Sequence, residues 1–186
     1  MLVFNTVTKE QLDEIQTDAG VLLRNFDPDE PNIVPADVIC ATTGGVNPSC
    51  VPSFVDYGED IDNVPNNTME MKRIDYYDCL FAFTSLNVSE TFIKLSLGAA
   101  KKVGNAIVPQ TELKNDDFSD IWWVGNKVGG GFVAIHLKNA LSDGGFSLQT
   151  TKKNKGQVAC TLRGHTSLTD QSVPMEFYST SSDTAS

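Results

Sequence analysis

Residues 68–85 read TMEMKRIDYYDCLFAFTS, and this stretch decides the fold class. In its first half the apolar Met69 and Met71 alternate with polar residues, the period of two that a half-buried β-strand requires. In its second half residues 80–83 are apolar on both faces. A strand covered on both sides needs a second layer of structure or a neighbouring subunit. The stretch therefore predicts a long extended run in a layered or self-associating β-protein.

Outward from this run, other segments also carry strand signals. Strands are predicted at residues 21–23, 37–43, 50–57, 120–124, 132–137, 145–151, 157–165 and 173–178. Residues 44–49, which begin Gly-Gly, predict the wide tip of a hairpin between 37–43 and 50–57, and residues 152–156 predict a second hairpin turn that ends in glycine. About nine or ten strands without βαβ alternation indicate a mainly β fold, a sandwich or closed barrel.

Two short α-helices are expected to flank the strands. Thr8 is a predicted N-cap with Gln11 as its capping-box partner, and this helix is expected to end before Gly20. Asn87 is the predicted cap of the second helix, which Gly98 should stop. This second helix carries an apolar stripe made by Val88, Phe92, Leu95 and Ala99.

The length of 186 residues and the 40% apolar content fit one domain, predicted at residues 1–178. Within it, residues 1–7 form an N-terminal arm ahead of the first helix. Residues 179–186 are rich in serine and threonine and are expected to be a flexible tail.

The formal net charge is −10, which disfavours a protein that grips duplex DNA through counterion release. A surface past which DNA slides remains compatible with this charge, and so does a plain solubility role. No apolar run is long enough to span a membrane, and the start lacks the features of a signal peptide. We therefore expect Cys40, Cys50, Cys79 and Cys160 to be reduced core thiols.

Catalytic signals are sparse. The two histidines, His136 in an apolar strand and His165 after a glycine, are expected to be satisfied polar residues. No nucleophile elbow, zinc motif, Walker loop or C-x-x-C pair is present, and Cys160 and His165 should point to opposite faces of a straight strand. The sequence predicts a protein that is not an enzyme, with no catalytic residue.

Two further features leave alternatives open. The acidic, proline-rich residues 26–36 could gather Asp27, Asp29 and Glu30 around calcium, but their spacing matches no EF-hand, so a solvated loop is preferred and no metal or other cofactor is expected. Trp122 and Trp123 point to opposite faces of their strand, so one should fill the core and the other is free for a partner surface. Apolar strands that are not covered internally favour pairing with copies of the same chain.

Four segments in chain order carry a resemblance to a known family. They are DAGVLLRNFD at 18–27, YGEDIDNVPNNTMEMKRI at 57–74, DFSDIWWVG at 117–125 followed by GGFVAIH at 130–136, and ALSDGGF at 140–146. Together they resemble the major tail proteins, or tail tube subunits, of bacteriophages with long, non-contractile tails.

The resemblance implies a β-sandwich or barrel flanked by a helix, with long β-hairpins extending to line a tube. Rings of six copies would stack into this tube, a conduit for DNA in the virion tail that is assembled in the bacterial host cytoplasm. The implied partners are sister copies, the tape measure protein and the tail terminator. Double-stranded DNA would pass without specific binding, and no membrane is involved.

Within this frame residues 36–86 are the expected lumen-lining hairpin region. Candidate lumen or inter-ring contacts are Glu59, Asp60, Asp62, Glu70 and Lys72. The loop 59–67 and the N-terminal arm 1–7 are the predicted contacts between rings.

Three rival interpretations stay open. One is the tube protein of a contractile tail or of a phage-tail-like particle, which shares the fold. Another is a monomeric β-sandwich that binds a carbohydrate or a protein through Trp122 or Trp123. The third is a hydrolase built from loop carboxylates and His136, which would carry a loop carboxyl of strongly raised pKa.

Overall fold

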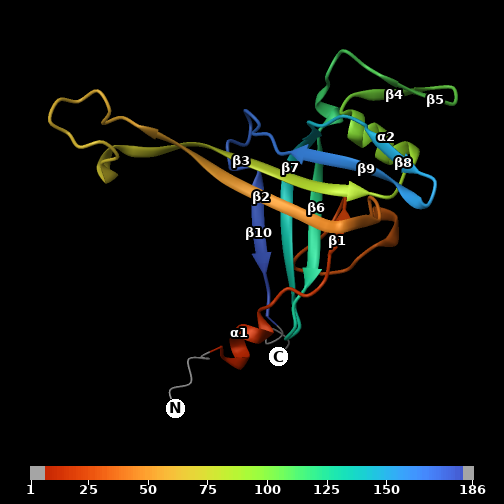
Figure 1. Cartoon of the computed structure of the whole chain (residues 1–186), viewed down its shortest axis with the longest axis horizontal. Coiled ribbons are helices and arrows are strands. Elements are labelled where there is room, and N and C mark those ends of the chain that lie inside the picture. The colour runs from red at the N-terminus through yellow and green to blue at the C-terminus, as the bar shows by residue number, and fades with distance from the viewer. Residues whose placement is uncertain (1–6, 182–186) are drawn as a thin grey trace.

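The protein is mainly β, as a computed structural model that describes residues 7–181 shows (Figure 1). Within that range the elements run in the order α1 (Lys9–Asp13), β1 (Val21–Leu23), β2 (Thr42–Asp56), β3 (Lys72–Ser85), α2 (Glu90–Leu97), β4 (Ala100–Val103), β5 (Ala106–Pro109), β6 (Ser119–Asn126), β7 (Phe132–Ser142), β8 (Leu148–Thr151), β9 (Asn154–Arg163) and β10 (Met175–Ser179). Single turns of 3₁₀-helix lie at Pro35–Asp37, Met69–Met71 and Asn115–Asp117. The mainly β fold with short helices that the sequence predicted is confirmed.

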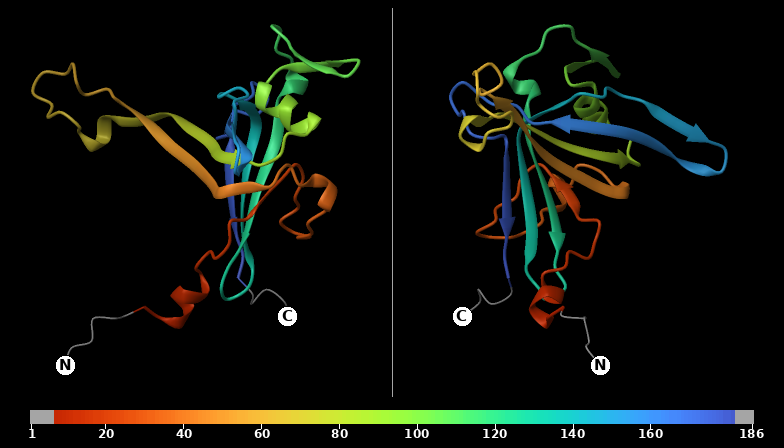
Figure 2. Two further views of the ribbon diagram at one scale, coloured as in Figure 1. Left: turned by 45° about the vertical axis from the view of Figure 1, so that its right-hand side comes forward. Right: turned by 60° about the vertical axis from the view of Figure 1, so that its left-hand side comes forward.

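Every strand pair in the described residues is antiparallel, and β7 joins two layers. Strands β1, β6, β7 and β10 form one layer, and β2, β3, β9 and β8 form the other. Only Leu141 and Ser142, at the end of β7, pair with β9. Just before them Asn139 takes a φ of +47°, which bends the strand from one layer into the other. The two layers therefore cross at a wide angle (Figure 2).

The main core lies between these layers. Ile121, Trp123, Ile135 and Leu137 come from one layer, and Phe81, Phe83, Val158, Cys160 and Leu162 come from the other. Phe92 of α2, fully buried, packs on Phe83 and closes one end. Burial of each large side chain contributes roughly 1.5–3 kcal/mol, so this cluster stabilises the body of the molecule.

A second, smaller cluster covers the other face of the β6–β7 layer. Trp122, Val124, Leu23 and Ala134 are buried there, and Phe26 packs against them from the acidic loop. The indole of Trp123 belongs to the main core and donates to the carbonyl of Ala19 at 3.1 Å. The prediction that the two tryptophans point to opposite faces is confirmed, although both are buried.

The first helix begins as predicted. Thr8 accepts from the backbone N–H of Gln11, and the Gln11 side chain accepts from the N–H of Thr8. The helix ends at Asp13, well before Gly20, because the chain then binds the β6–β7 turn: Val128 N–H donates to the Ile15 carbonyl. The buried ammonium of Lys127 pairs with Glu14 at 2.5 Å and fixes this segment to the body.

The predicted hairpin between residues 37–43 and 50–57 is wrong. Residues 42–56 form one strand, β2, which pairs with β3 along its length. Gly44 and Gly45 both have positive φ, at the point where the register shifts between Thr43 and Val46. The two glycines therefore form a bulge instead of a turn. Pro48 is tolerated because β2 is an edge strand, which can leave one row of hydrogen-bonding groups unpaired.

Three smaller predictions also need correction. Met69–Met71 is a 3₁₀ turn and not the start of the strand. Ser89, not Asn87, caps α2, because the Asn87 side chain instead accepts from the Ala41 N–H at 2.8 Å. The β8–β9 turn is Lys152-Lys153, since Thr151 already pairs with Asn154, so Gly156 lies inside β9. Gly98 does end α2, with a φ of +75°.

Candidate functional site

The outer half of the β2–β3 hairpin projects from the body as a two-stranded ribbon, which we call the arm and define as residues 50–79 (Figures 1 and 2). Strand β9 pairs with β3 only between Leu80 and Ser85, so residues 72–78 lack a neighbour on that side among the described residues. Strand β2 ends the sheet, so its other edge is open as well. Both edges of the arm therefore offer unpaired backbone groups.

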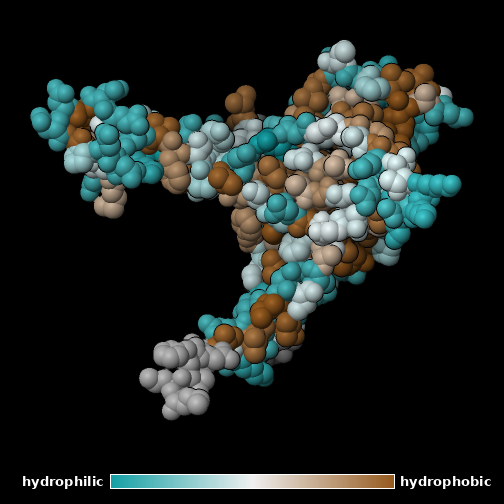
Figure 3. Space-filling view, in the orientation of Figure 1, coloured by the Kyte–Doolittle hydropathy of each residue, from teal (hydrophilic) through white to brown (hydrophobic). Residues whose placement is uncertain are grey.

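The arm exposes large apolar side chains. Seven of them are between 43% and 79% exposed: Val51, Phe54, Tyr57, Ile61, Met69, Ile74 and Tyr76. In the space-filling view apolar and polar side chains are mixed along the arm, and its far end is mostly hydrophilic (Figure 3). A two-stranded hairpin is at best marginally stable alone in water, so an arm of this composition is suited to a partner that covers it.

The tip of the arm is held by its own hydrogen bonds. The Asp56 carboxylate accepts from the N–H of Gly58 at 2.8 Å and from the N–H of Asn67 at 2.9 Å. The ammonium of Lys72 donates to the Asn67 side chain at 2.9 Å and lies 4.9 Å from the centre of the Phe54 ring. These bonds tie the two ends of the tip loop together.

The five residues singled out from the sequence all lie at this tip. Glu59, Asp60, Asp62, Glu70 and Lys72 are exposed, and they come from the loop between β2 and β3 or from the first residue of β3. Within residues 7–181 none of the four carboxylates forms an ion pair. Of the predicted N-terminal arm, residues 1–6 lie outside the described residues.

The base of the arm carries a cysteine pair that sequence reasoning missed. Cys50 and Cys79 are direct cross-strand partners, and their Sγ atoms are 3.0 Å apart without a disulfide. Burial, together with the neighbouring Cys50, raises the pKa of the Cys79 thiol to about 12. The polar run at residues 58–67 indicates a loop between two strands, but it does not fix the register that pairs these two cysteines.

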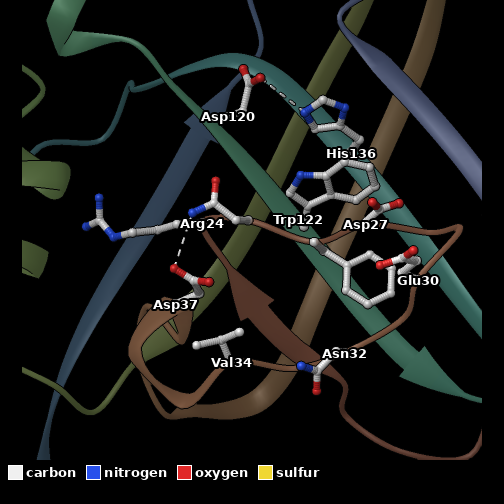
Figure 4. A pocket seen from close by; sticks show the side chains of 11 residues that line it. Arg24, Asp27, Glu30, Asn32, Val34, Asp37, Asp120, Trp122 and His136 are labelled. Atoms are coloured by element: carbon white, nitrogen blue, oxygen red, sulfur yellow. Dashed lines mark hydrogen bonds and ion pairs between the residues drawn. The ribbon is translucent and has the colours of Figure 1, made fainter.

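A pocket of about 530 Å³ lies where the acidic loop crosses β6 and β7 (Figure 4). Its wall includes Trp122, 8% exposed, whose ring stacks on His136 with centroids 4.0 Å apart. The His136 Nε2 lies 3.3 Å from an Asp120 oxygen, in a direction that does not make a hydrogen bond, and Nδ1 lies 3.5 Å from Glu176. His136 therefore lies between two carboxylates from neighbouring strands. The sequence alone could not predict this arrangement.

Among the described residues, this pocket is lined by carboxylates and an imidazole but by no hydroxyl or thiol group. Its lining contains carboxylates and amides and no serine or cysteine. Burial raises the pKa of the Cys160 thiol to about 12, which keeps this sulfur protonated and weakly nucleophilic at neutral pH. His165 lies against Phe118, and its Nδ1 is 3.2 Å from the Asn139 carbonyl. Within residues 7–181, neither histidine ring forms a hydrogen bond or ion pair with a cysteine or a hydroxyl group.

The acidic loop does not gather its carboxylates. Asp27 accepts from the N–H of Asp29 at 2.9 Å, as in a local turn. Over residues 7–181 no group of three or more His, Cys, Asp or Glu side chains is arranged to hold a metal ion. The same range contains no helix whose length and apolar character would let it cross a membrane.

Comparison with protein-family models gives no match, and comparison with curated proteins gives none either. The candidate function therefore depends on the arm and on the chemistry of its surfaces.

Proposed function

We propose that this chain is a structural subunit that polymerises into a phage tail tube as stacked rings, with six copies in each ring. The observation that carries the proposal is the arm: a long ribbon with both edges open and apolar side chains exposed. Open strand edges in water tend to pair with the edges of other molecules, and in an assembly that pairing joins the subunits.

Ring closure gives this ribbon its partners. When hairpins from successive copies pair side by side and the ring closes, every open edge in the lumen acquires a neighbour. The region expected to line the lumen, residues 36–86, consists largely of the two strands of one hairpin, β2 and β3. One element from each copy can thus supply the whole lining, which supports the tube over a monomer.

The charge of the subunit suits a conduit. At −10 for each copy, a ring of six carries roughly −60, so a passing duplex is repelled instead of retained. In this proposal the protein is a virion component with no catalytic role and no bound cofactor. The tape measure protein occupies the lumen before DNA does, and the tail terminator closes the tube.

The same features are compatible with the tube of a contractile tail or a phage-tail-like particle, which remains the nearest alternative. The monomeric binding module has less support. It needs an open aromatic face, yet the ring of Trp122 is stacked on His136 and packs against Phe26, with ring centroids 5.7 Å apart. Trp123 is part of the main core.

Negative-stain microscopy of the purified chain across a concentration series tests this function. We expect hollow rings or tubes of uniform diameter above a threshold concentration. The tube proposal fails if only single particles appear at every concentration, with and without the crowding agent polyethylene glycol. Tryptophan fluorescence that responds to a carbohydrate under the same conditions would favour the binding module.

A further inference from the structure

The charges of the molecule are unevenly distributed. The arm contains seven acidic and two basic residues, a net charge of −5 out of −10 for the chain. Its tip loop, residues 57–71, contributes four carboxylates and no cation. Asp56 is occupied with the backbone of the loop, but the four tip carboxylates are exposed and have no ion-pair partner within residues 7–181.

The opposite charge is concentrated at another turn. Lys152, Lys153 and Lys155 lie within four residues at the β8–β9 hairpin, which we call the lysine turn (residues 152–155). All three are exposed and form no ion pair in the described part of the chain. Many other cations already have acidic partners: Lys94, Lys102, Lys127, Lys138 and Arg163. The lysine turn is thus a cluster of cations without internal partners.

The acidic tip and the lysine turn cannot meet within one copy. The arm leaves one side of the body, and the β8–β9 hairpin leaves the other side, toward the opposite end of the long axis (Figures 1 and 2). Contact between the two patches therefore requires two molecules. Such a contact joins different patches on the two copies, and a head-to-tail contact of this kind propagates into rings or filaments.

We propose that the acidic arm tip of one copy docks against the lysine turn of a second copy during assembly. This inference rests on the proposed function and names the surface that the arm meets. Copies that each carry −10 repel one another, and arms that pair side by side bring −5 next to −5 with no counter-charge at their tips. A lysine turn of another copy placed against each tip offsets part of that repulsion. The exposed Phe54, Tyr57 and Ile74 beside the tip then supply apolar area to the same contact.

Charge reversal on each side tests the docking. The first variant is Glu59→Lys/Asp60→Lys at the tip, and the second is Lys152→Glu/Lys153→Glu at the turn. Each is expected to raise the protein concentration needed for tube formation by about tenfold or more, because like charges then face each other. The variant that combines all four substitutions restores opposite charges at the contact. Because the tip and the turn then attract each other again, the concentration that it needs for tube formation is expected to lie within about threefold of the wild-type value.

Matched controls separate docking from net charge. Lys101→Glu/Lys114→Glu changes the net charge as the turn variant does, at lysines that also have no ion-pair partner in residues 7–181. Glu112→Lys/Asp116→Lys changes the net charge by the same amount as the tip variant. Both controls should assemble like wild type. Thermal melts followed by circular dichroism check that every monomer is folded, and Asp62→Lys/Glu70→Lys provides a second tip reversal if the first is unstable.

The outcomes are distinct. Equal defects in variants and controls, or a combined variant no better than the single reversals, would overturn the docking. Normal assembly of both reversals would overturn it too, while leaving the tube function intact. Wild-type protein that never assembles would instead remove the proposed function. Binding of a duplex oligonucleotide that is lost only in Lys152→Glu/Lys153→Glu would assign the lysine turn to nucleic acid and overturn the docking.

Discussion

At the scale of single residues, Cys50 and Cys79 are placed to respond to an oxidant. Cys50 is partly exposed, whereas Cys79 is buried and its pKa is raised to about 12. Oxidised glutathione should therefore react first at Cys50, releasing one glutathione thiol. The Cys79 sulfur should then displace the second glutathione, leaving a Cys50–Cys79 disulfide and two reduced glutathiones.

Peptide mass spectrometry after oxidation checks this prediction. We expect one cross-link between the two peptides, formed faster at pH 9 than at pH 7 because more of the Cys79 sulfur is then thiolate. In Cys79→Ser the glutathione should stay on Cys50. A stable glutathione adduct on Cys50 in the wild-type protein would show that the two sulfurs are not positioned as described.

Glu176 provides a pH-dependent prediction. The adjacent Lys138 ammonium, 2.6 Å away, holds the pKa of the Glu176 carboxyl below its ordinary value of 4.5, and the Tyr178 hydroxyl assists. A carboxyl whose folded pKa is depressed stabilises the protein above its unfolded pKa, and this contribution disappears as the pH falls through the folded value. Glu176→Gln should therefore lower the melting temperature at pH 7, and this effect should shrink as the pH falls below 4.5 and through the folded pKa of Glu176.

Melting curves at several pH values measure this difference. Glu112→Gln, an exposed carboxylate without an ion pair in residues 7–181, is the matched control and should change little at any pH. A Glu176→Gln effect that grew toward low pH would contradict the assigned pairing.

At the scale of elements, the arm should be separable from the body. Its exposed residues contribute little to the core, which lies between the two layers. Replacing residues 54–75 with Asn-Gly, so that Ser53 and Tyr76 flank a two-residue turn, should leave the monomer folded with a melting temperature close to wild type. Assembly should be lost, as sedimentation velocity would show. Tubes built from the shortened chain would exclude the arm from the assembly contacts.

The elements also show what the sequence could predict. Local signals succeeded: the Thr8–Gln11 capping box and the stop at Gly98 depend on neighbours in the chain. The hairpin at 44–49 failed because Gly-Gly and Pro48 fit a turn and an edge-strand bulge equally well. Pairing with β3 decided between them, and strand pairing is a long-range property.

The candidate site was predictable in part for the same reason. Glu59, Asp60 and Asp62 were found because they lie in one polar, proline-containing run between two extended segments. Glu70 and Lys72 were found because they alternate with methionines at the start of the second segment. The Cys50–Cys79 pair depends on the register between β2 and β3. The position of His136 between Asp120 and Glu176 depends on the pairing of β7 with β6 and β10. Neither arrangement can be predicted from the sequence until the register of the strands is known.

At the scale of the whole molecule, the central claim is that the open arm is completed by sister copies. Amide hydrogen exchange of residues 50–79, compared between dilute monomer and assembled protein, tests it most directly. The account predicts rapid exchange at the outer edge of the arm in the monomer and strong protection in the assembly, while the core strands β6 and β7 are protected in both. Arm amides that exchange equally fast in the two states, or that are already protected in the monomer, would contradict it.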